Sequence, residues 1–215
     1  GAQISAGMRA AAGAIERVWW RGDHLEVRVI GGGEATGICG SGLIDAVAAL
    51  LEAGALDESG RLAEGHPLVT MAPHPGVAGL QPAARLTDRI VLTQRDIREL
   101  QLAKAAIATA IGLLLQSAGL RPGELEQLYL AGAFGQYIAP AAALRIGLLP
   151  LIDPEKIKFI GNAACAGAEM GLISLAERRA ITELARRVEY VEVAAAPDFQ
   201  DLFAENLLFG ADAAD

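Results

Sequence analysis

The stretch Leu128-Tyr-Leu-Ala-Gly-Ala-Phe-Gly135 is a short apolar run that ends abruptly in a loop of very small residues. The apolar run predicts a buried strand of a parallel sheet, and the small residues predict a loop whose backbone is barely covered by side chains. Ligands of open α/β sheets bind beyond the carboxyl ends of the strands, so we expect this loop to form the floor of a nucleotide site. In the alternative interpretation the glycines only allow a tight turn, because a lone Gly-x-x-Gly pair is a weak signal.

A second glycine-rich stretch, Thr36-Gly-Ile-Cys-Gly-Ser-Gly42, leads into an amphipathic helix predicted over residues 43–52. A glycine loop at a helix start presents free backbone N–H groups and the positive end of the helix dipole, which favour a phosphate group. Gly40, Ser41 and Gly42 are therefore a candidate phosphate loop. The alternative is that Ser41 only caps the helix, since the stretch matches neither the P-loop nor the dinucleotide-binding pattern.

A third junction, Gly161-Asn-Ala-Ala-Cys-Ala-Gly-Ala-Glu-Met170, combines a candidate N-cap, Asn162, with small residues at helical spacing. Small residues let a helix approach another backbone closely. We therefore expect this helix to act as a hinge or as a contact between two lobes.

The order of the remaining elements predicts an α/β fold with a mixed sheet. Two β-rich runs, 14–20 and 25–30, are joined by the turn Arg21-Gly-Asp-His24 and predict an antiparallel hairpin. Residues 57–90 are rich in Pro and Gly and predict an irregular surface excursion with at most one short strand, followed by a strand at 90–92. Further along the chain we expect helices at 140–146, 174–187 and 197–209, a loop and strand over 154–160, and a strand at 188–193.

The longest predicted helix begins at Thr93-Gln-Arg-Asp96, a capping box with Asp in the last position, and ends before Gly119. Its central part, residues 103–115, is apolar on nearly every face and predicts a buried crossover helix. Lys104 is the exception within this part. Its side chain is expected either to reach toward a nucleotide or to extend to solvent from the edge of the core.

The chain has 215 residues, of which 53% are hydrophobic, and a formal net charge of -8. This composition predicts an ordered globular protein and disfavours a nucleic-acid binder, whose affinity depends on clustered Lys and Arg. A basic protein partner fits the acidic charge better. The longest apolar run, residues 105–115, is too short for a membrane span, and we expect no membrane association.

Cys39 and Cys165 are the two cysteines of the chain, and its three histidines share no ligand-like spacing with them. This set lacks the Cys-x-x-Cys pairs of a zinc site and the four thiolates of an iron–sulfur cluster, so we expect no metal centre here. Few thiols fit a reducing compartment, and we therefore expect a cytoplasmic protein. Cys39 is expected to be a small buried thiol, the alternative being a reactive thiol activated by helix amides.

Five motifs occur in order along nearly the whole chain. They are Ser5-Ala-Gly-Met-Arg-Ala-Ala, Gly37-Ile-Cys-Gly-Ser-Gly-Leu-Ile-Asp45, Thr93-Gln-Arg-Asp-Ile-Arg-Glu-Leu-Gln-Leu-Ala-Lys104, Tyr129-Leu-Ala-Gly-Ala-Phe-Gly135 and Arg145-Ile-Gly-Leu-Leu-Pro150. In these motifs the chain resembles the carboxyl-terminal domain of the ATP-dependent reductive activators of corrinoid proteins, within the acetate and sugar kinase, heat-shock chaperone and actin (ASKHA) superfamily. This resemblance implies a ribonuclease H-like lobe of the actin-like ATPase fold.

The resemblance implies a part in an ATP-driven machine that returns a corrinoid protein from cob(II)alamin to cob(I)alamin. The nucleotide would be ATP with Mg²⁺ in the intact protein, and the partner a corrinoid protein or a corrinoid methyltransferase component; a homodimer is left open. By the same resemblance, Gly132, Ala133, Phe134 and Gly135 match the adenosine-binding motif, and Gly161 and Asn162 begin the second connecting motif at the lobe interface.

The resemblance also implies that residues 1–215 are the second, adenosine-binding half of the ATPase domain. The chain opens without Met, and we expect the two Asp-x-Gly-Thr-like phosphate turns, the first lobe and a ferredoxin domain with its iron–sulfur cluster upstream of Gly1. Residues 1–215 alone are therefore expected not to hydrolyse ATP.

Two other functions stay open from the residues. A lobe of a small-molecule kinase of the same superfamily would need a catalytic carboxylate, and a protein-interaction module without a nucleotide would use only the acidic surface. Asp45 and Asp96 are the carboxylates close to motif ends, and both are expected to serve helix starts. We therefore place the activator before the kinase, and the kinase before the interaction module.

Overall fold

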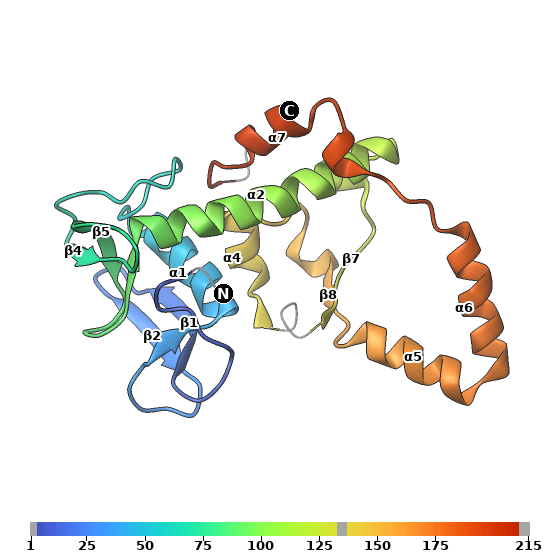
Figure 1. The fold of residues 1–215 in the computed structure, drawn as a ribbon, viewed down its shortest axis with the longest axis horizontal. Helices are drawn as coiled ribbons and strands as arrows, with labels where there is room; N and C mark the ends of the chain where they lie inside the picture. The colour runs from blue at the N-terminus through green and yellow to red at the C-terminus, as the bar shows by residue number, and fades with distance from the viewer. Residues whose placement is uncertain (1–3, 133–136, 211–215) are drawn as a thin grey trace.

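The computed structural model describes residues 4–132 and 137–210. The predicted site residues Ala133, Phe134 and Gly135 lie outside this range. The described chain is an α/β structure in which a long helix, α2 (Gln94–Ser117), runs across a body of small sheets and shorter helices. A pair of helices, α5 (Ala163–Ile173) and α6 (Leu175–Arg187), projects to one side (Figure 1).

The first sheet contains the predicted hairpin. Strands β1 (Ala14–Trp20) and β2 (Leu25–Val29) pair antiparallel, and β3 (Gly37–Ile38) pairs parallel with β1, which gives the mixed order β2-β1-β3. Helix α1 (Gly40–Glu52) packs on β1 so closely that a Cβ atom on Gly42 would overlap the carbonyl group of Ile15. The mixed sheet with an early hairpin is confirmed, and Gly42 is required for the contact between helix and strand.

A second sheet replaces the irregular excursion expected over residues 57–90. Strands β4 (Val69–Pro73), β5 (Leu80–Arg85) and β6 (Val91–Thr93) form an antiparallel sheet in that order, so the expectation of at most one strand before residue 90 was wrong. Pro82 is tolerated in the middle strand because β6 pairs with β5 only from Ala83 onward. Pro82 has no backbone N–H to donate, and it lies where the β6 side of β5 is an unpaired edge.

Helix α2 (Gln94–Ser117) begins with the predicted capping box. The Asp96 carboxylate accepts hydrogen bonds from the backbone N–H and the hydroxyl of Thr93, both at 2.8 Å, and the Asp96 N–H donates to Thr93 Oγ1. Asp96 also accepts from the N–H and the hydroxyl of Ser5, at 2.6 and 2.7 Å. The capping residue therefore attaches the amino-terminal segment to the start of the longest helix.

One face of α2 is more exposed than its sequence predicts. Leu102, Ile107 and Leu114 are 48%, 45% and 47% exposed, so the prediction of a helix buried on nearly every face was wrong. Among the described residues, α2 is the helix that is long and apolar enough to cross a membrane. This is weak evidence for a membrane span, because the core helix of a folded domain has the same length and composition. The opposite face of α2 packs against the domain, so we interpret α2 as a helix of the folded domain.

The polar residues on the packed face of α2 hold the chain that follows helix α7 (Phe199–Glu205). Lys104 is 1% exposed, and its Nζ donates to the carbonyl of Leu208. Gln101 donates to the carbonyl of Leu207 at 2.8 Å, and Thr109 accepts from Asn206 Nδ2 at 3.1 Å. Lys104 therefore neither extends to solvent nor points to the predicted nucleotide loop; it fixes the carboxyl-terminal segment.

The third sheet is the parallel pair β7 (Leu128–Leu130) and β8 (Ile157–Phe159). The parallel direction is confirmed, but β7 is not a buried strand, since Tyr129 is 58% exposed. In the described chain β7 has one neighbour, β8, and no helix covers both of its faces. The short helix α4 (Pro140–Arg145) lies between the two strands in sequence, as predicted, and packs on α1.

Beyond β8 the chain forms the helices α5 (Ala163–Ile173) and α6 (Leu175–Arg187), whose positions were predicted. The strand predicted at 188–193 is absent, because these residues are exposed and pair with no neighbouring strand among the described residues. The last predicted helix is shorter than expected and is reduced to α7. Three short 3₁₀ turns complete the described part of the chain: η1 (Pro122–Glu124), η2 (Pro154–Lys156) and η3 (Val193–Ala195).

The first prediction concerns Gly42. Gly42→Ala places a methyl group against the carbonyl of Ile15, so we expect a loss of about 1–3 kcal/mol in unfolding free energy, measured by urea denaturation. Gly112→Ala is the matched control, because Gly112 also lies in a helix but has open space at its Cβ position. The control should be neutral or stabilising by up to about 1 kcal/mol. Equal effects of the two substitutions would contradict the packing role.

The second prediction concerns Lys104. Burial lowers the pKa of Lys104 from 10.5 to about 8. Between these two pH values the unfolded chain keeps the proton that the folded chain has lost, so the unfolding free energy should rise with pH, by up to about 3 kcal/mol. Urea denaturation from pH 7.5 to 10.5 measures this slope. Lys104→Met should lack this part of the pH dependence, and an unchanged slope in that variant would refute the assignment.

Candidate functional site

Two glycines at the carboxyl ends of the parallel strands lie in direct contact. The N–H of Gly132, after β7, donates a hydrogen bond of 2.7 Å to the carbonyl of Gly161, after β8. Both residues have positive φ, +84° and +63°, and a Cβ atom on either would meet no atom of residues 4–132 and 137–210 within 4 Å. The structure therefore brings two of the predicted segments together and leaves a bare backbone surface at the strand ends.

Asn162, next to this junction, begins helix α5. Its Oδ1 accepts a hydrogen bond from the N–H of Cys165 at 3.2 Å, which confirms the predicted N-cap. The cap directs the amino-terminal end of α5 to the same place as the Gly132–Gly161 contact. A part for Asn162 in ligand binding stays a prediction.

The lining of a cleft of about 340 Å³ includes Ser41 of the predicted site residues and two residues that are close in sequence to the other predicted segments. Tyr137 follows the predicted adenosine loop, Phe159 lies two residues before Gly161, and Ser41 comes from the glycine-rich start of α1. Tyr137 and Phe159 are 53% and 42% exposed, so their rings are accessible. The complete lining is Glu16, Arg17, Arg28, Ser41, Tyr137, Ile138, Ala139, Pro140 and Phe159.

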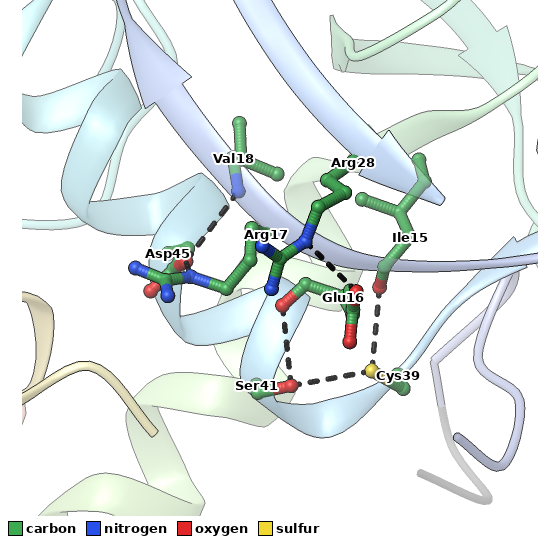
Figure 2. A network of polar contacts seen from close by, with 8 residues as sticks. All are labelled: Ile15, Glu16, Arg17, Val18, Arg28, Cys39, Ser41 and Asp45. Atoms are coloured by element: carbon green, nitrogen blue, oxygen red, sulfur yellow. Dashed lines mark hydrogen bonds and ion pairs between the residues drawn. The ribbon is translucent and has the colours of Figure 1, made fainter. Parts of the chain in front are cut away.

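The candidate phosphate loop is not a loop in the structure. Gly40, Ser41 and Gly42 form the first turn of α1, and Cys39 occupies the N-cap position without a side-chain cap. The Ser41 hydroxyl donates to the carbonyl of Glu16 at 3.2 Å, so the alternative that Ser41 caps the helix was wrong (Figure 2). Of the three residues, Ser41 borders the cleft, whereas Gly42 is buried against β1.

Cys39 is buried, and its thiol donates to the carbonyl of Ile15 at 3.3 Å (Figure 2). The prediction of a small buried thiol is therefore confirmed. Cys165 is exposed, and no group of three or more His, Cys, Asp or Glu side chains within residues 4–132 and 137–210 is arranged to hold a metal ion. The residues present do not fit an iron–sulfur cluster.

The hairpin supplies cleft residues that the sequence analysis missed. Arg17 and Arg28 stand directly opposite each other in the β1–β2 register, and two like charges in that position destabilise a sheet unless they are compensated. Arg17 Nε donates to Asp45 Oδ2 at 2.6 Å, and Arg28 Nε donates to Glu16 Oε1 at 2.8 Å (Figure 2). The guanidinium groups of both arginines also lie over the Trp19 ring, 5.2 and 6.0 Å from its centre.

A signal for this cluster existed in the sequence, because alternate residues of a strand share one face. Arg17 and Trp19 are two residues apart on β1, and the short hairpin turn brings β2 beside them. Their importance depends on Asp45, which lies on α1 and is not adjacent to them in sequence.

Asp45 serves the hairpin, not the helix start that was expected. Its Oδ2 accepts from Arg17 and, at 3.4 Å, from the N–H of Val18, while its buried Oδ1 has no hydrogen-bond partner among the described residues. Burial raises the pKa of the Asp45 carboxyl, and the Arg17 guanidinium opposes this shift. This carboxylate is therefore committed to holding β1 on α1.

The arrangement is suited to binding a ligand. It offers a bare backbone surface at Gly132 and Gly161, and a cleft whose lining carries accessible aromatic rings and hydrogen-bonded charged groups. A planar base can lie against a bare backbone and an aromatic side chain, and the guanidinium groups can meet polar substituents. Asp96 is engaged in the capping box, as expected, and Asp45 in its ion pair, so neither is free to act as a catalytic base.

Comparisons with known proteins show the family of the chain. Residues 1–214 match the family described as the C-terminal domain of RACo, the ASKHA domain. The chain is 36% identical to the corrinoid activation enzyme RamQ of Eubacterium limosum, over 98% of this chain and 37% of RamQ. It is 26% identical to the [Co(II) methylated amine-specific corrinoid protein] reductase of Methanosarcina barkeri, over 94% of this chain and 39% of that protein.

A solved structure supports the fold. The reductive activator for corrinoid, iron-sulfur protein superimposes with a TM-score of 0.85 at 33% identity, over 98% of this chain and 35% of that one. The chain thus spans little more than a third of the length of the relatives it matches. The actin-like fold inferred from the motifs is shown by this likeness, and the chain belongs to the family of the carboxyl-terminal ASKHA domain of the reductive activators of corrinoid proteins.

Proposed function

We propose that the chain is the ATP-binding part of an activator that drives reduction of a corrinoid protein from cob(II)alamin to cob(I)alamin. The names of its relatives support the reaction, and each of these relatives is a much longer protein. The proposal of ATP binding rests on the hydrogen bond between Gly132 and Gly161, which lies two residues after Phe159 of the cleft. This hydrogen bond joins the two segments that resemble the adenosine and second connecting motifs.

The residues present fit the adenosine end of a nucleotide. Open space at the Cβ positions of Gly132 and Gly161 leaves room for a ligand on the backbone, and the rings of Tyr137 and Phe159 border the adjoining cleft. ATP would supply the free energy that drives an unfavourable electron transfer. The Mg²⁺ ion and the phosphate turns belong, in this proposal, to the part of the protein upstream of Gly1.

The helices α5 and α6 support a place for the chain as the second half of an ATPase domain. Neither helix has a buried residue, although α5 is apolar on all sides and exposes Leu172 and Ile173 at 75% and 86%. A helix of this composition is normally buried. We propose that the first lobe, upstream in the same protein, covers α5, so that the junction at Gly161 lies at the interface of the two lobes.

The remaining parts of the proposal follow from the same family. The partner is a corrinoid protein or a corrinoid methyltransferase component, and the electron comes through an iron–sulfur cluster on an upstream ferredoxin domain. The free thiols Cys39 and Cys165 suit a cytoplasmic location. A small-molecule kinase is less well supported, because Asp45 and Asp96 have structural partners.

A substitution at Gly132 tests the nucleotide site in the full-length protein. Gly132→Val places a branched side chain in the open space over the backbone, and we expect ATP affinity, measured by calorimetry, to fall at least about 100-fold, or about 2.8 kcal/mol. Gly119→Val is the matched control, since Gly119 also has positive φ and open space but lies at the end of α2. Both variants carry the same backbone strain, so a loss of affinity in both, or in neither, would contradict the site.

A second test uses residues 1–215 alone with ATP and Mg²⁺. Phosphoryl transfer depends on groups placed around the γ-phosphate, and the sequence has no Asp-x-Gly-Thr-like turn to supply them. We expect no turnover and a dissociation constant of about 1 mM, which corresponds to about 4 kcal/mol. Turnover in the range of about 1 to 10³ s⁻¹, typical of enzymes, would show that the phosphate groups are held within these residues.

A further inference from the structure

A second cavity lies away from the glycine junction. It is a groove of about 940 Å³ between α2, η1, residues 147–151 and the segment around α7, and it shares no lining residue with the cleft. Its volume lies near the upper end of the range of small-molecule sites. The groove is not used by the proposed nucleotide site, so its composition needs a separate explanation.

The floor and one edge of the groove are apolar. Ile111 and Leu115 of α2 face Leu149 and Leu202 across it. Two further leucines on the lining, Leu151 and Leu208, are 45% and 50% exposed. Exposed leucines gathered in a concave surface, unlike single exposed ones, are a feature of protein-binding grooves.

The rim of the groove is acidic. Glu58, Glu124 and Glu205 line it, and Arg121 is the basic residue on the lining. Arg121 is already engaged with Glu124, through its N–H at 2.7 Å and its Nε at 3.5 Å. The carboxylates of Glu58 and Glu205 are exposed and have no hydrogen bond or ion pair with the described residues. Two free negative charges therefore stand beside an apolar floor.

We propose that this groove binds a segment of a partner protein that presents apolar side chains flanked by Lys or Arg, and that the corrinoid protein of the proposed function supplies it. Apolar residues of the segment would cover the exposed leucines, and its basic residues would meet Glu58 and Glu205. Such an arrangement is helix-in-groove recognition with charge complementarity at the rim. The choice of the corrinoid protein rests on the proposed function, whereas the chemistry of the segment rests on the groove alone.

Charge decides against the other occupants. A second copy of this chain, with a net charge of -8, would meet the acidic rim with like charge, and nucleic acid would do the same. A compact small molecule would leave much of a groove with an exposed rim unfilled. A basic apolar segment satisfies both the floor and the rim.

The test compares two charge reversals in the full-length protein. Glu58→Lys with Glu205→Lys reverses the rim, and Glu64→Lys with Glu189→Lys makes the same change of net charge at exposed positions that do not line the groove. We expect the rim pair to weaken binding of the corrinoid protein at least 10-fold, measured by calorimetry at about 0.1 M salt, and the control pair to weaken it less than 3-fold. Equal effects of the two pairs, or no effect of either, would overturn the groove.

The apolar half of the proposal has its own variant. Leu151→Ser should weaken the same binding several-fold, whereas Leu80→Ser, at a comparably exposed leucine of β5, should not. ATP affinity should stay unchanged in all these variants, because none of the substituted residues borders the cleft. Unchanged binding in Leu151→Ser would show that charge alone is at work and would refute docking in the groove.

A probe peptide separates the groove from the proposed function. The probe is a 14-residue amphipathic helix with Leu on one face and Lys on the other, titrated by fluorescence anisotropy. If the rim pair weakens peptide binding 10-fold and the control pair does not, the groove is supported. This holds even when the corrinoid protein fails to bind the wild type, a result that would refute the proposed partner. No binding of the peptide, or equal weakening by both pairs, refutes the groove.

Discussion

The buried carboxylate of Asp96 is the interaction on which the arrangement of the domain depends. It is 0% exposed and accepts hydrogen bonds from the backbone N–H and the hydroxyl of both Thr93 and Ser5. These four bonds fix the start of α2 and the amino-terminal segment, which passes beside β3. Removing the carboxylate would leave the two buried donors of Thr93 without this acceptor, which costs about 1–3 kcal/mol for each group. Helix α2 in turn holds the chain after α7 through Gln101 and Lys104.

The elements that could be predicted are those that local chemistry specifies. The Thr93–Asp96 capping box, the β1–β2 turn and the Asn162 cap each need only neighbours within a few residues, and all three are confirmed. The strand expected at 188–193 has the right composition but no partner strand in the described chain, and β propensity without pairing does not make a strand. The role of Lys104 was hidden because its acceptor, the carbonyl of Leu208, lies 104 residues away.

The candidate site likewise contains residues that local sequence specifies and residues that only tertiary packing brings together. Its glycines could be predicted because a run of small residues directly after an apolar strand is a local sequence pattern. In the structure the N–H of Gly132 donates a hydrogen bond to the carbonyl of Gly161. The alternation of β1 places Arg17 and Trp19 on one face, but this signal did not single out Arg17 and Arg28, because arginines in a strand are common at surfaces. Only the packing of α1 on β1 brings Asp45 to Arg17 and makes the pair part of a fixed cleft wall.

The distribution of buried residues explains why the candidate site lies where it does. The core is built on α1, β1 and the residues around them, whereas β7 is half exposed and α5 and α6 have no buried residue. The Gly132–Gly161 contact joins the ends of β7 and β8, and helix α5 begins directly after it, so it lies at the border of the well-buried part of the described chain. A ligand at such a border contacts the packed part on one side and, in the proposed full-length protein, the covering lobe on the other. Its binding free energy would then depend on how the two lobes are packed, which is the physical requirement for coupling ATP to a change in the rest of the protein.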